Sequence, residues 1–324
     1  MPDLVRLGPN FFVARFETMK VYSALAAVEA LLREGKINSQ TTLIDSSSGI
    51  YAYALALACH RFGLKCHIVG SLTVDKTLLL QMKALGATVE QVKTAGTLKL
   101  DQNKRVERVR ELLAANPDYY WMRQYHDDVH YLGYRPIANH IARLLGQDRL
   151  CLIGSVGSGC STGGLTEAFR EQGIDVRLIG VQPFGSVTFG SEHVDDPGII
   201  IAGIGSSIAF DNVRPELYDE LHWVSFDYGA SGAISLLKNH AIFAGLSSGC
   251  CYLVAAREAA LHPDRTILFV APDTGHRYVE DVFTYQAEAL PIAQLYPKCI
   301  TDQQALSLPW ACMNWGRRSF EVRQ

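Results

Sequence analysis

Short apolar runs alternate along the chain with stretches whose apolar residues recur at helical spacing. This alternation predicts an α/β fold built around parallel strands. In the first third of the chain, strands are expected at residues 10–16, 42–45, 65–69 and 88–92, and helices at residues 20–34, 51–62 and 75–85. Gly35 and Gly63 directly follow two of these helices, where glycine commonly ends a helix.

The pattern repeats from residue 149. Residues 149–153 are almost continuously apolar, which suits a strand buried on both faces of a parallel sheet. We expect a glycine-rich turn over 154–164, a helix over 165–171 and strands over 176–181 and 266–270. Residues 296–324 do not continue this alternation of strand and helix patterns. We expect two interleaved three-layer α/β lobes with mostly parallel central sheets. The smaller lobe comprises residues 17–128, and the larger one comprises residues 1–16 and 129–324.

Composition excludes several classes of protein. Of the 324 residues, 48% are apolar and 19% charged, with a net charge of −3, which argues against a disordered chain and against a nucleic-acid binder. No run approaches the ~18–20 apolar residues of a membrane helix, and the N-terminus lacks the pattern of a secretory signal. Eight cysteines without a C-x-x-C pair indicate reduced thiols and no metal site. We therefore expect a cytoplasmic protein that binds neither nucleic acid nor membranes.

The glycine-rich turn at residues 154–164 is a candidate phosphate site. It joins a buried strand to a helix, so backbone N–H groups and the positive end of the helix dipole would favour an anion. Ser158, Ser161 and Thr162 would add hydroxyl donors. The turn has no lysine, which argues against a nucleoside-triphosphate loop, and the next strand ends in Gln182 rather than an acid, which weakens dinucleotide binding. A tight turn without a ligand stays an alternative.

Two further strand–helix junctions carry candidate chemistry. Lys20 stands at the first, with Thr18 as the expected N-cap, although a lone lysine there is more often solvated than catalytic. The second junction, Asp-Ser-Ser-Ser-Gly at residues 45–49, offers hydroxyls and free N–H groups that suit a carboxylate. An ordinary cluster of N-cap residues explains it equally well.

A last group of motifs follows Gly-Leu-Ser-Ser-Gly at residues 245–249. Asp273 and Thr274 come at the end of a predicted strand, which is where ligands bind in open parallel sheets. For Asp273 we favour a role in the turn, and for Cys250 and Cys251 a buried helix start.

Taken in order, these motifs resemble the cysteine synthase/cystathionine β-synthase family of pyridoxal-phosphate enzymes, of fold type II, from residue 4 to about residue 283. The resemblance implies that Lys20 forms the Schiff base with the cofactor. Residues 201–205 match a further segment of the family. The resemblance also assigns roles to the remaining site residues. Ser47, Ser48 and Gly49 bind the substrate carboxylate, Gln124 lies near the substrate, Gly157, Ser158, Gly159, Cys160 and Ser161 bind the cofactor phosphate, and Thr274 faces the pyridine nitrogen.

Three departures from the family accompany this match. Ile50 stands where the family has an asparagine that hydrogen-bonds the cofactor ring oxygen, and isoleucine offers no donor. The segment at residues 16–19 is shorter and less polar than in the family, and the N-terminal arm is nearly absent. These changes suggest an altered substrate or a member that has lost catalysis.

The resemblance implies a β-replacement reaction on a β-substituted L-alanine of the O-acetyl- or O-phospho-serine type. The reaction proceeds through an aminoacrylate, to which a small nucleophile adds to make cysteine or a related non-protein amino acid. Lys20 would act as general base, and the neutral hydroxyl of Thr274 would favour replacement or elimination over transamination. Asp273 would reverse that preference if it faced the ring. The alternatives are β-elimination by a lyase and a non-catalytic pseudoenzyme. The resemblance also implies a homodimer.

Overall fold

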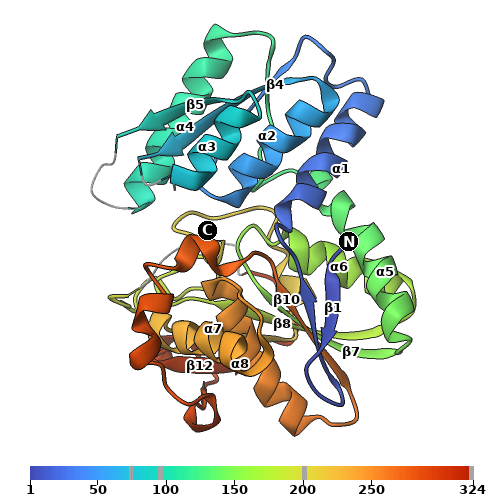
Figure 1. Ribbon diagram of the computed structural model, residues 1–324, viewed down its shortest axis with the longest axis vertical. Helices are drawn as coiled ribbons and strands as arrows, with labels where there is room; N and C mark the ends of the chain where they lie inside the picture. The colour runs from blue at the N-terminus through green and yellow to red at the C-terminus, as the bar shows by residue number, and fades with distance from the viewer. Residues whose placement is uncertain (73, 75, 94–97, 199–202, 321–324) are drawn as a thin grey trace. The chain divides into compact units, whose positions relative to one another are not determined.

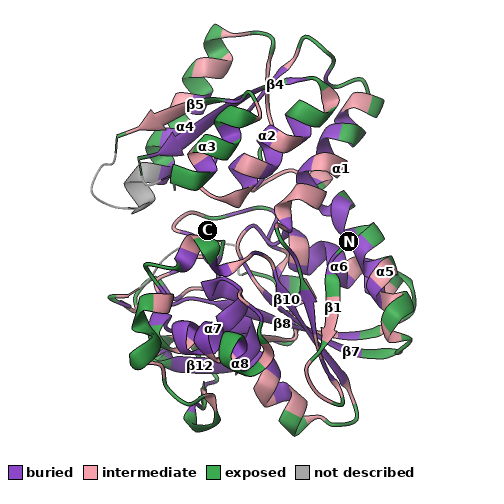
Figure 2. Ribbon diagram, viewed as in Figure 1, coloured by how far each residue is buried: buried purple, intermediate pink, exposed green. Residues whose placement is uncertain are grey.

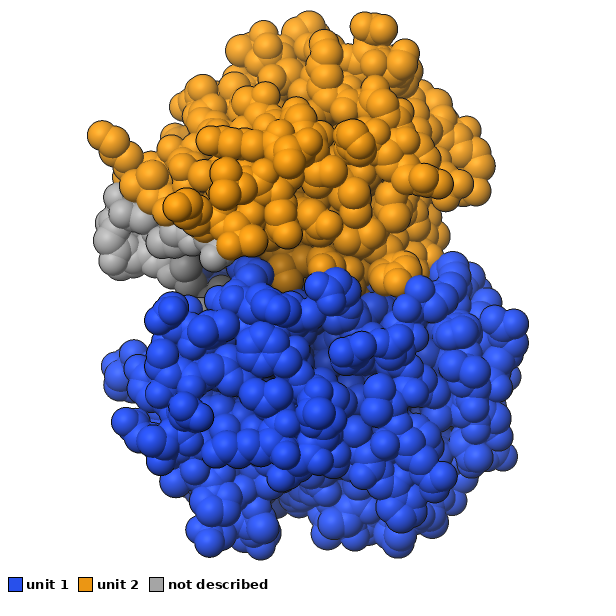
Figure 3. All heavy atoms as spheres, in the orientation of Figure 1, with its two compact units in different colours: residues 1–17, 134–324 blue, residues 18–133 orange. Residues whose placement is uncertain are grey.

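The structure is a computed structural model that describes residues 1–72, 74, 76–93, 98–198 and 203–320, without the side chains of residues 98–101. The chain forms two compact units, which Figure 3 colours separately. The small unit is Thr18–Gly133, and the large unit combines Met1–Glu17 with Tyr134–Gln324. The boundary expected after residue 128 falls inside the 3-10 helix Asp128–Tyr134, at whose end the small unit stops.

The small unit is built on a four-stranded parallel sheet (Figure 1). The strands lie in the order β5-β4-β3-β6, each parallel to its neighbour. Its elements are α1 (Lys20–Arg33), β3 (Thr42–Ser46), α2 (Ile50–Phe62), β4 (Lys65–Ser71), α3 (Lys76–Ala84), β5 (Thr88–Val92), α4 (Leu98–Ala115) and β6 (Tyr119–Trp121). The predicted strands and helices lie here within a few residues of their expected bounds, while α4 and β6 were not predicted.

The large unit contains an eight-stranded sheet in the order β1-β2-β10-β7-β8-β9-β12-β11. The five strands from β2 to β9 in this order are parallel, whereas β1 and β12 pair antiparallel with β2 and β9. The strands are β1 (Asp3–Arg6), β2 (Phe11–Arg15), β7 (Arg149–Ser155), β8 (Asp175–Gln182), β9 (Glu220–Val224), β10 (Thr266–Ala271), β11 (Lys298–Cys299) and β12 (Trp310–Asn314). The α-helices are α5 (Arg135–Leu145), α6 (Cys160–Glu171), α7 (Phe226–His240) and α8 (Leu246–Leu261). The predicted α/β class with mostly parallel sheets is confirmed.

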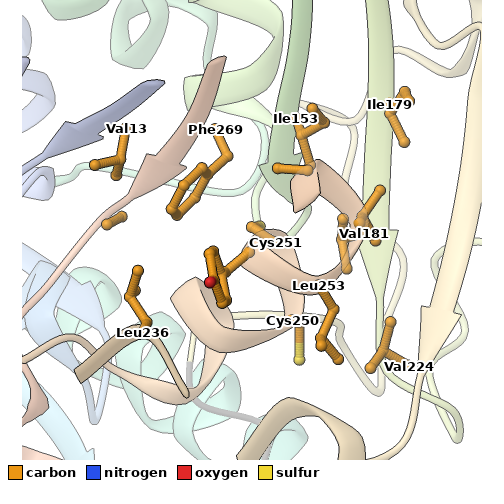
Figure 4. Close-up of a cluster of buried hydrophobic side chains, with 14 of the residues drawn as sticks. Val13, Ile153, Ile179, Val181, Val224, Leu236, Cys250, Cys251, Leu253 and Phe269 are labelled. Carbon is orange, nitrogen blue, oxygen red and sulfur yellow. The ribbon is translucent and has the colours of Figure 1, made fainter. Parts of the chain in front are cut away.

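The core of the large unit forms between this sheet and α8 (Figure 4). Ile153, Val181 and Phe269 project from neighbouring strands toward Cys251 and Leu253 on the helix. All five side chains are at most 3% exposed, and Figure 2 shows the central strands buried along most of their length. Because successive strand residues point to opposite faces, burial of every residue from Leu150 to Ile153 means that both faces of the sheet are covered.

The C-terminal segment, residues 296–324, extends this sheet by two strands. β12 pairs antiparallel with β9, and β11 pairs with β12. Buried Trp310 donates its indole N–H to His222 Nδ1 at 3.0 Å. The sequence pattern predicts no particular element for residues 296–324, because two short strands at a sheet edge leave little periodicity in the sequence.

His222, Glu220 and Cys312 form a compact group at this edge. Their potential ligand atoms lie within 4.8 Å of one another. Because Trp310 donates to Nδ1, the imidazole proton lies on Nε2, which bonds Glu220 Oε1 at 2.7 Å. Neither ring nitrogen then offers a lone pair to a cation. Hydrogen bonds of His222 to Trp310 and Glu220 therefore account for this group and join β12 to β9.

Within the described parts of the chain, no helix combines the length and the apolarity needed to cross a membrane.

Candidate active site

The large unit carries the predicted phosphate loop between β7 and α6. Gly159 adopts a left-handed conformation (φ +81°), and the helix starts at the next residue. The predicted start at residue 165 was wrong, because Gly163 donates its N–H to the Gly159 carbonyl and so already belongs to the helical ladder. Cys160 and Ser161 therefore lie in the first turn of α6 rather than in the preceding turn.

Two glycines let the neighbouring backbone approach this loop closely. A Cβ atom on Gly157 would lie 2.8 Å from the Gly203 carbonyl oxygen, and one on Gly159 would lie 2.5 Å from the Asn212 carbonyl oxygen. In addition, Gly205 donates its N–H to the Val156 carbonyl at 2.8 Å. The structure thus brings the described part of the 201–205 motif against the phosphate loop, while residues 201 and 202 lie outside the described residues.

The chemistry of the loop fits a phosphate group. The first N–H groups of α6 have no carbonyl partner within the helix, and the helix dipole is positive at this end. Ser158 is buried in the loop, and the Cys160 thiol points back to the Ser158 carbonyl at 3.8 Å. The Thr162 hydroxyl instead contacts the Gly159 carbonyl and the Tyr218 hydroxyl, so its predicted role as an anion donor was wrong.

Thr274 and Asp273 follow β10 and differ in environment. Asp273 is buried, and its Oδ2 accepts a hydrogen bond from the Tyr278 hydroxyl at 3.0 Å. Burial raises the pKa of this carboxyl group to about 6. Thr274 is only half-buried, with its hydroxyl 3.0 Å from His276 Nδ1. Asp273 therefore serves the turn, as favoured, and Thr274 is the more accessible of the two.

The Gly-Leu-Ser-Ser-Gly motif lies at the start of α8, next to this turn. Gly245 donates its N–H to the Asp273 carbonyl at 3.3 Å, which joins the two motifs. A Cβ atom on Gly249 would lie 2.2 Å from the Gly229 carbonyl oxygen of α7. Gly249 is thus required by the packing of α7 on α8, and Cys250 and Cys251 are buried in the helix as expected.

In the small unit, Lys20 is the first residue of α1. The N-cap is Met19, which has helical dihedral angles and makes no side-chain capping bond, so the expected capping role of Thr18 was wrong. The carbonyl of Thr18 accepts the Val21 N–H at 3.4 Å, so Thr18 contributes its backbone rather than its hydroxyl to the first turn. A lysine at the positive end of a helix with no acid in the first turn does not stabilise that helix. Stabilisation of α1 therefore does not explain why a lysine occupies this position.

Ser47, Ser48 and Gly49 connect β3 to α2, and Gly49 is the N-cap of that helix. The Ser48 hydroxyl oxygen accepts the Ser71 N–H at 2.8 Å. Buried Ser47 accepts the Gly49 N–H at 3.4 Å. Ile50 begins α2, and the positive end of this helix dipole favours an anion beside the loop.

Arg105 on α4 is a residue of this site that the sequence analysis missed. Its guanidinium Nη1 donates to Ser48 Oγ at 2.9 Å, and the residue is only 6% exposed. A buried cation therefore lies directly on the loop predicted to bind a carboxylate. No signal in the sequence connects two residues 57 positions apart when the helix that carries the arginine is itself not predicted.

Gln124 lies on the other side of the same loop. Its backbone N–H donates to Asp45 Oδ2 at 3.1 Å, and its side-chain amide donates to the Ser46 carbonyl at 3.4 Å. The small unit thus gathers the loop, Gln124 and Arg105 at the carboxyl ends of β3 and β6, the edge at which open parallel sheets bind ligands.

Comparisons with known proteins agree with this geometry. The family described as pyridoxal-phosphate dependent enzyme matches residues 14–273. An N-(2-amino-2-carboxyethyl)-L-glutamate synthase of Ralstonia nicotianae is 32% identical over 264 residues, which cover 79% of this chain and 75% of the relative.

Two solved structures have a similar fold. The O-acetylserine-dependent cystathionine β-synthase of Helicobacter pylori has a TM-score of 0.76 at 26% identity, covering 86% of this chain and 94% of that one. The cysteine synthase of Entamoeba histolytica has a TM-score of 0.78 at 23% identity, covering 87% and 88%.

These findings confirm the predicted resemblance to cysteine synthase-type enzymes, the predicted cofactor and the predicted class of enzyme. The names of the relatives also agree with β-replacement as the reaction. The chain belongs to the family of pyridoxal-phosphate-dependent enzymes.

Proposed function

We propose that this protein joins a β-substituted L-alanine, such as an O-phospho- or O-acetyl-serine, to the amino group of a second amino acid. The name of the Ralstonia relative describes a 2-amino-2-carboxyethyl group, the alanine skeleton linked through its β-carbon, on the nitrogen of glutamate. The observation that carries the proposal is the Arg105–Ser48 contact, which puts a positive charge at the carboxylate loop. An amino acid with a further anionic group fits this loop better than a small neutral ligand does.

The chain's own residues divide the binding work. Pyridoxal phosphate, when bound, supplies the electron sink that allows the α-proton and the β-substituent to leave. The loop at residues 157–161 would hold its phosphate, Lys20 would carry the covalent link, and Thr274 would face the ring nitrogen. The substrate carboxylate would accept hydrogen bonds from Ser47, Ser48 and the N–H groups at the start of α2.

Lys20 Nζ would remove the α-proton once it is free of the cofactor. Its place at the positive end of α1, with no acid in the first turn, contributes nothing to helix stability and is compatible with such a chemical role. The neutral hydroxyl of Thr274 would leave the ring nitrogen unprotonated. An unprotonated ring favours replacement over transamination. A homodimer and a cytoplasmic location stay predictions from the sequence.

Product analysis tests this proposal. Protein loaded with cofactor is incubated with O-phospho-L-serine and L-glutamate, or with sulfide in a parallel reaction, and the products are identified by mass spectrometry. We expect the product linked through the glutamate nitrogen. Cysteine alone would identify a cysteine synthase, pyruvate alone would identify a β-eliminating lyase, and no turnover of either substrate pair would contradict the proposal.

Replacing Arg105 with glutamine should raise the KM for the serine-type substrate by about 10- to 100-fold, because a hydrogen bond from a charged group contributes roughly 1.5–3 kcal/mol. Arg108 on the same helix is the matched control. It is more exposed and pairs with Glu90 and Glu111 rather than with the loop, so R108Q should leave KM unchanged. Equal effects of R105Q and R108Q on KM would contradict a role of Arg105 in substrate binding.

A further inference from the structure

Asp45 is a buried carboxylate that no step of the proposed reaction uses. It is 1% exposed and lies near the carboxyl end of β3, two residues before Ser47. Three N–H groups converge on it. Oδ1 accepts from Ser46 N at 2.7 Å and from the Trp121 indole at 3.0 Å, and Oδ2 accepts from Gln124 N at 3.1 Å.

These contacts favour an ionised carboxylate, because all three groups around its oxygens are donors and a protonated oxygen would add a fourth. Burial raises the pKa of Asp45 to about 6 despite the three hydrogen bonds, so the ionised form is costly in the folded protein. Among the residues that the structure describes, no cationic side chain forms an ion pair with Asp45 that would offset this cost. The neighbouring charge of Asp127 raises the pKa of Asp45 further, and the charge of Asp45 in turn raises the pKa values of Tyr125 and Cys66.

The contacts of Asp45 indicate the role of this buried carboxylate. It ties the start of the substrate loop, at Ser46, to the segment that follows β6, at Trp121 and Gln124. Gln124 in turn donates its side-chain amide to the Ser46 carbonyl at 3.4 Å, and Met122 continues the strand ladder to Ile44. The loop and Gln124 therefore meet through one carboxylate within a single compact unit.

We propose that Asp45 is a positioning residue for the amino-acid substrate, whose carboxylate holds Gln124 and the loop at residues 46–48 in the arrangement that receives the substrate carboxylate. The inference rests on the proposed function, because it assigns the substrate to this loop. It implies that the loop is ordered before the substrate arrives, so that substrate binding does not include the entropy cost of ordering the loop.

Asp45→Asn tests the inference in the cofactor-loaded enzyme. Asparagine keeps the size of the side chain but turns an amide N–H₂ toward one of the three N–H donors, so at least one hydrogen bond is lost. We expect the KM for the serine-type substrate to rise about 10- to 100-fold with kcat changed much less, since the lost contacts act on substrate binding. Trp121→Phe removes a single donor and should raise KM by a smaller factor.

The pH profile is a second readout. In the wild-type enzyme, protonation of Asp45 turns one oxygen into a donor, so KM should rise as the pH falls below about 6. D45N lacks the titrating group, and its KM should not show this acid limb. Amide hydrogen exchange without substrate supplies a readout independent of turnover, because D45N should speed the exchange of residues 47–52 and 124.

Asp219→Asn is the matched control. Asp219 in the large unit also accepts a backbone N–H, from Leu178 at 2.8 Å, and lies outside the proposed site. We expect D219N to lower the melting temperature and leave KM unchanged. The inference is overturned if D45N leaves both KM and exchange unchanged, or if D45N behaves as D219N does. If the wild-type enzyme forms no product, the proposed function fails on its own, while hydrogen exchange still decides whether Asp45 holds the loop.

Discussion

Replacing Lys20 with alanine is expected to abolish the visible absorption of the lysine-linked cofactor and to lower kcat by about 10³-fold or more. Removal of a general base alone costs ~10²–10⁴-fold, and here the same amine would also carry the covalent link. Lys20 begins α1 at a place where a lysine does not stabilise the helix, which is why a chemical role accounts for it better than a structural one.

Lys36→Ala is the control for this substitution. Lys36 follows the end of α1, is exposed and pairs with Glu34. K36A should keep the absorption band and the rate of the wild-type enzyme. A K20A protein that retains the band and turns over at the wild-type rate would refute the assignment of Lys20.

Replacing Gly159 with alanine is expected to weaken cofactor binding by about 100-fold and to destabilise the fold. The residue is left-handed at φ +81°, and an added Cβ would meet the Asn212 carbonyl oxygen at 2.5 Å and the Val213 Cα at 2.8 Å. Left-handed backbone costs a non-glycine residue roughly 1–2 kcal/mol, and overpacking adds ~1–3 kcal/mol. The backbone must shift to relieve the contact, which displaces the N–H groups that would bind the phosphate.

Gly173 separates these two effects. It is left-handed at φ +79°, and an added Cβ would meet nothing within 4 Å. Gly173→Ala therefore keeps the conformational cost and removes the clash. Urea unfolding and titration with pyridoxal phosphate should show a modest loss of stability and unchanged affinity for G173A, against larger losses of both for G159A. Equal affinities for the two variants would mean that the close approach at Gly159 does not shape the site.

Much of the fold follows from the sequence because parallel strands covered on both faces appear as continuous apolar runs. β3 and β7 are such strands, and they extend only one or two residues beyond their predicted bounds. β5 is a partly exposed edge strand that also has its predicted bounds. The start of α6 was missed because Gly163 and Gly164 lower helix propensity locally, while tertiary packing keeps them helical and buried. β12 was missed because its pairing with β9 depends on a partner about 90 residues away.

Some residues of the candidate site could be predicted from the sequence, and others could not. Its contiguous motifs, at Lys20, at residues 47–49 and at residues 157–161, were found because each lies at one strand–helix junction. Arg105 and Asp45 were not assigned to the site, since their roles depend on contacts with residues distant in the chain, such as Ser48 and Gln124. Sequence patterns indicate where backbone N–H groups face an anion, but not which buried charge is packed beside them.

Reductive trapping identifies the lysine that carries the cofactor. Protein saturated with pyridoxal phosphate is reduced with borohydride, digested and mapped by mass spectrometry for the lysine that carries the pyridoxyl group. We expect a single major label, on Lys20, formed in proportion to the visible absorption. A label on another lysine, or no label after saturation with cofactor, would contradict it.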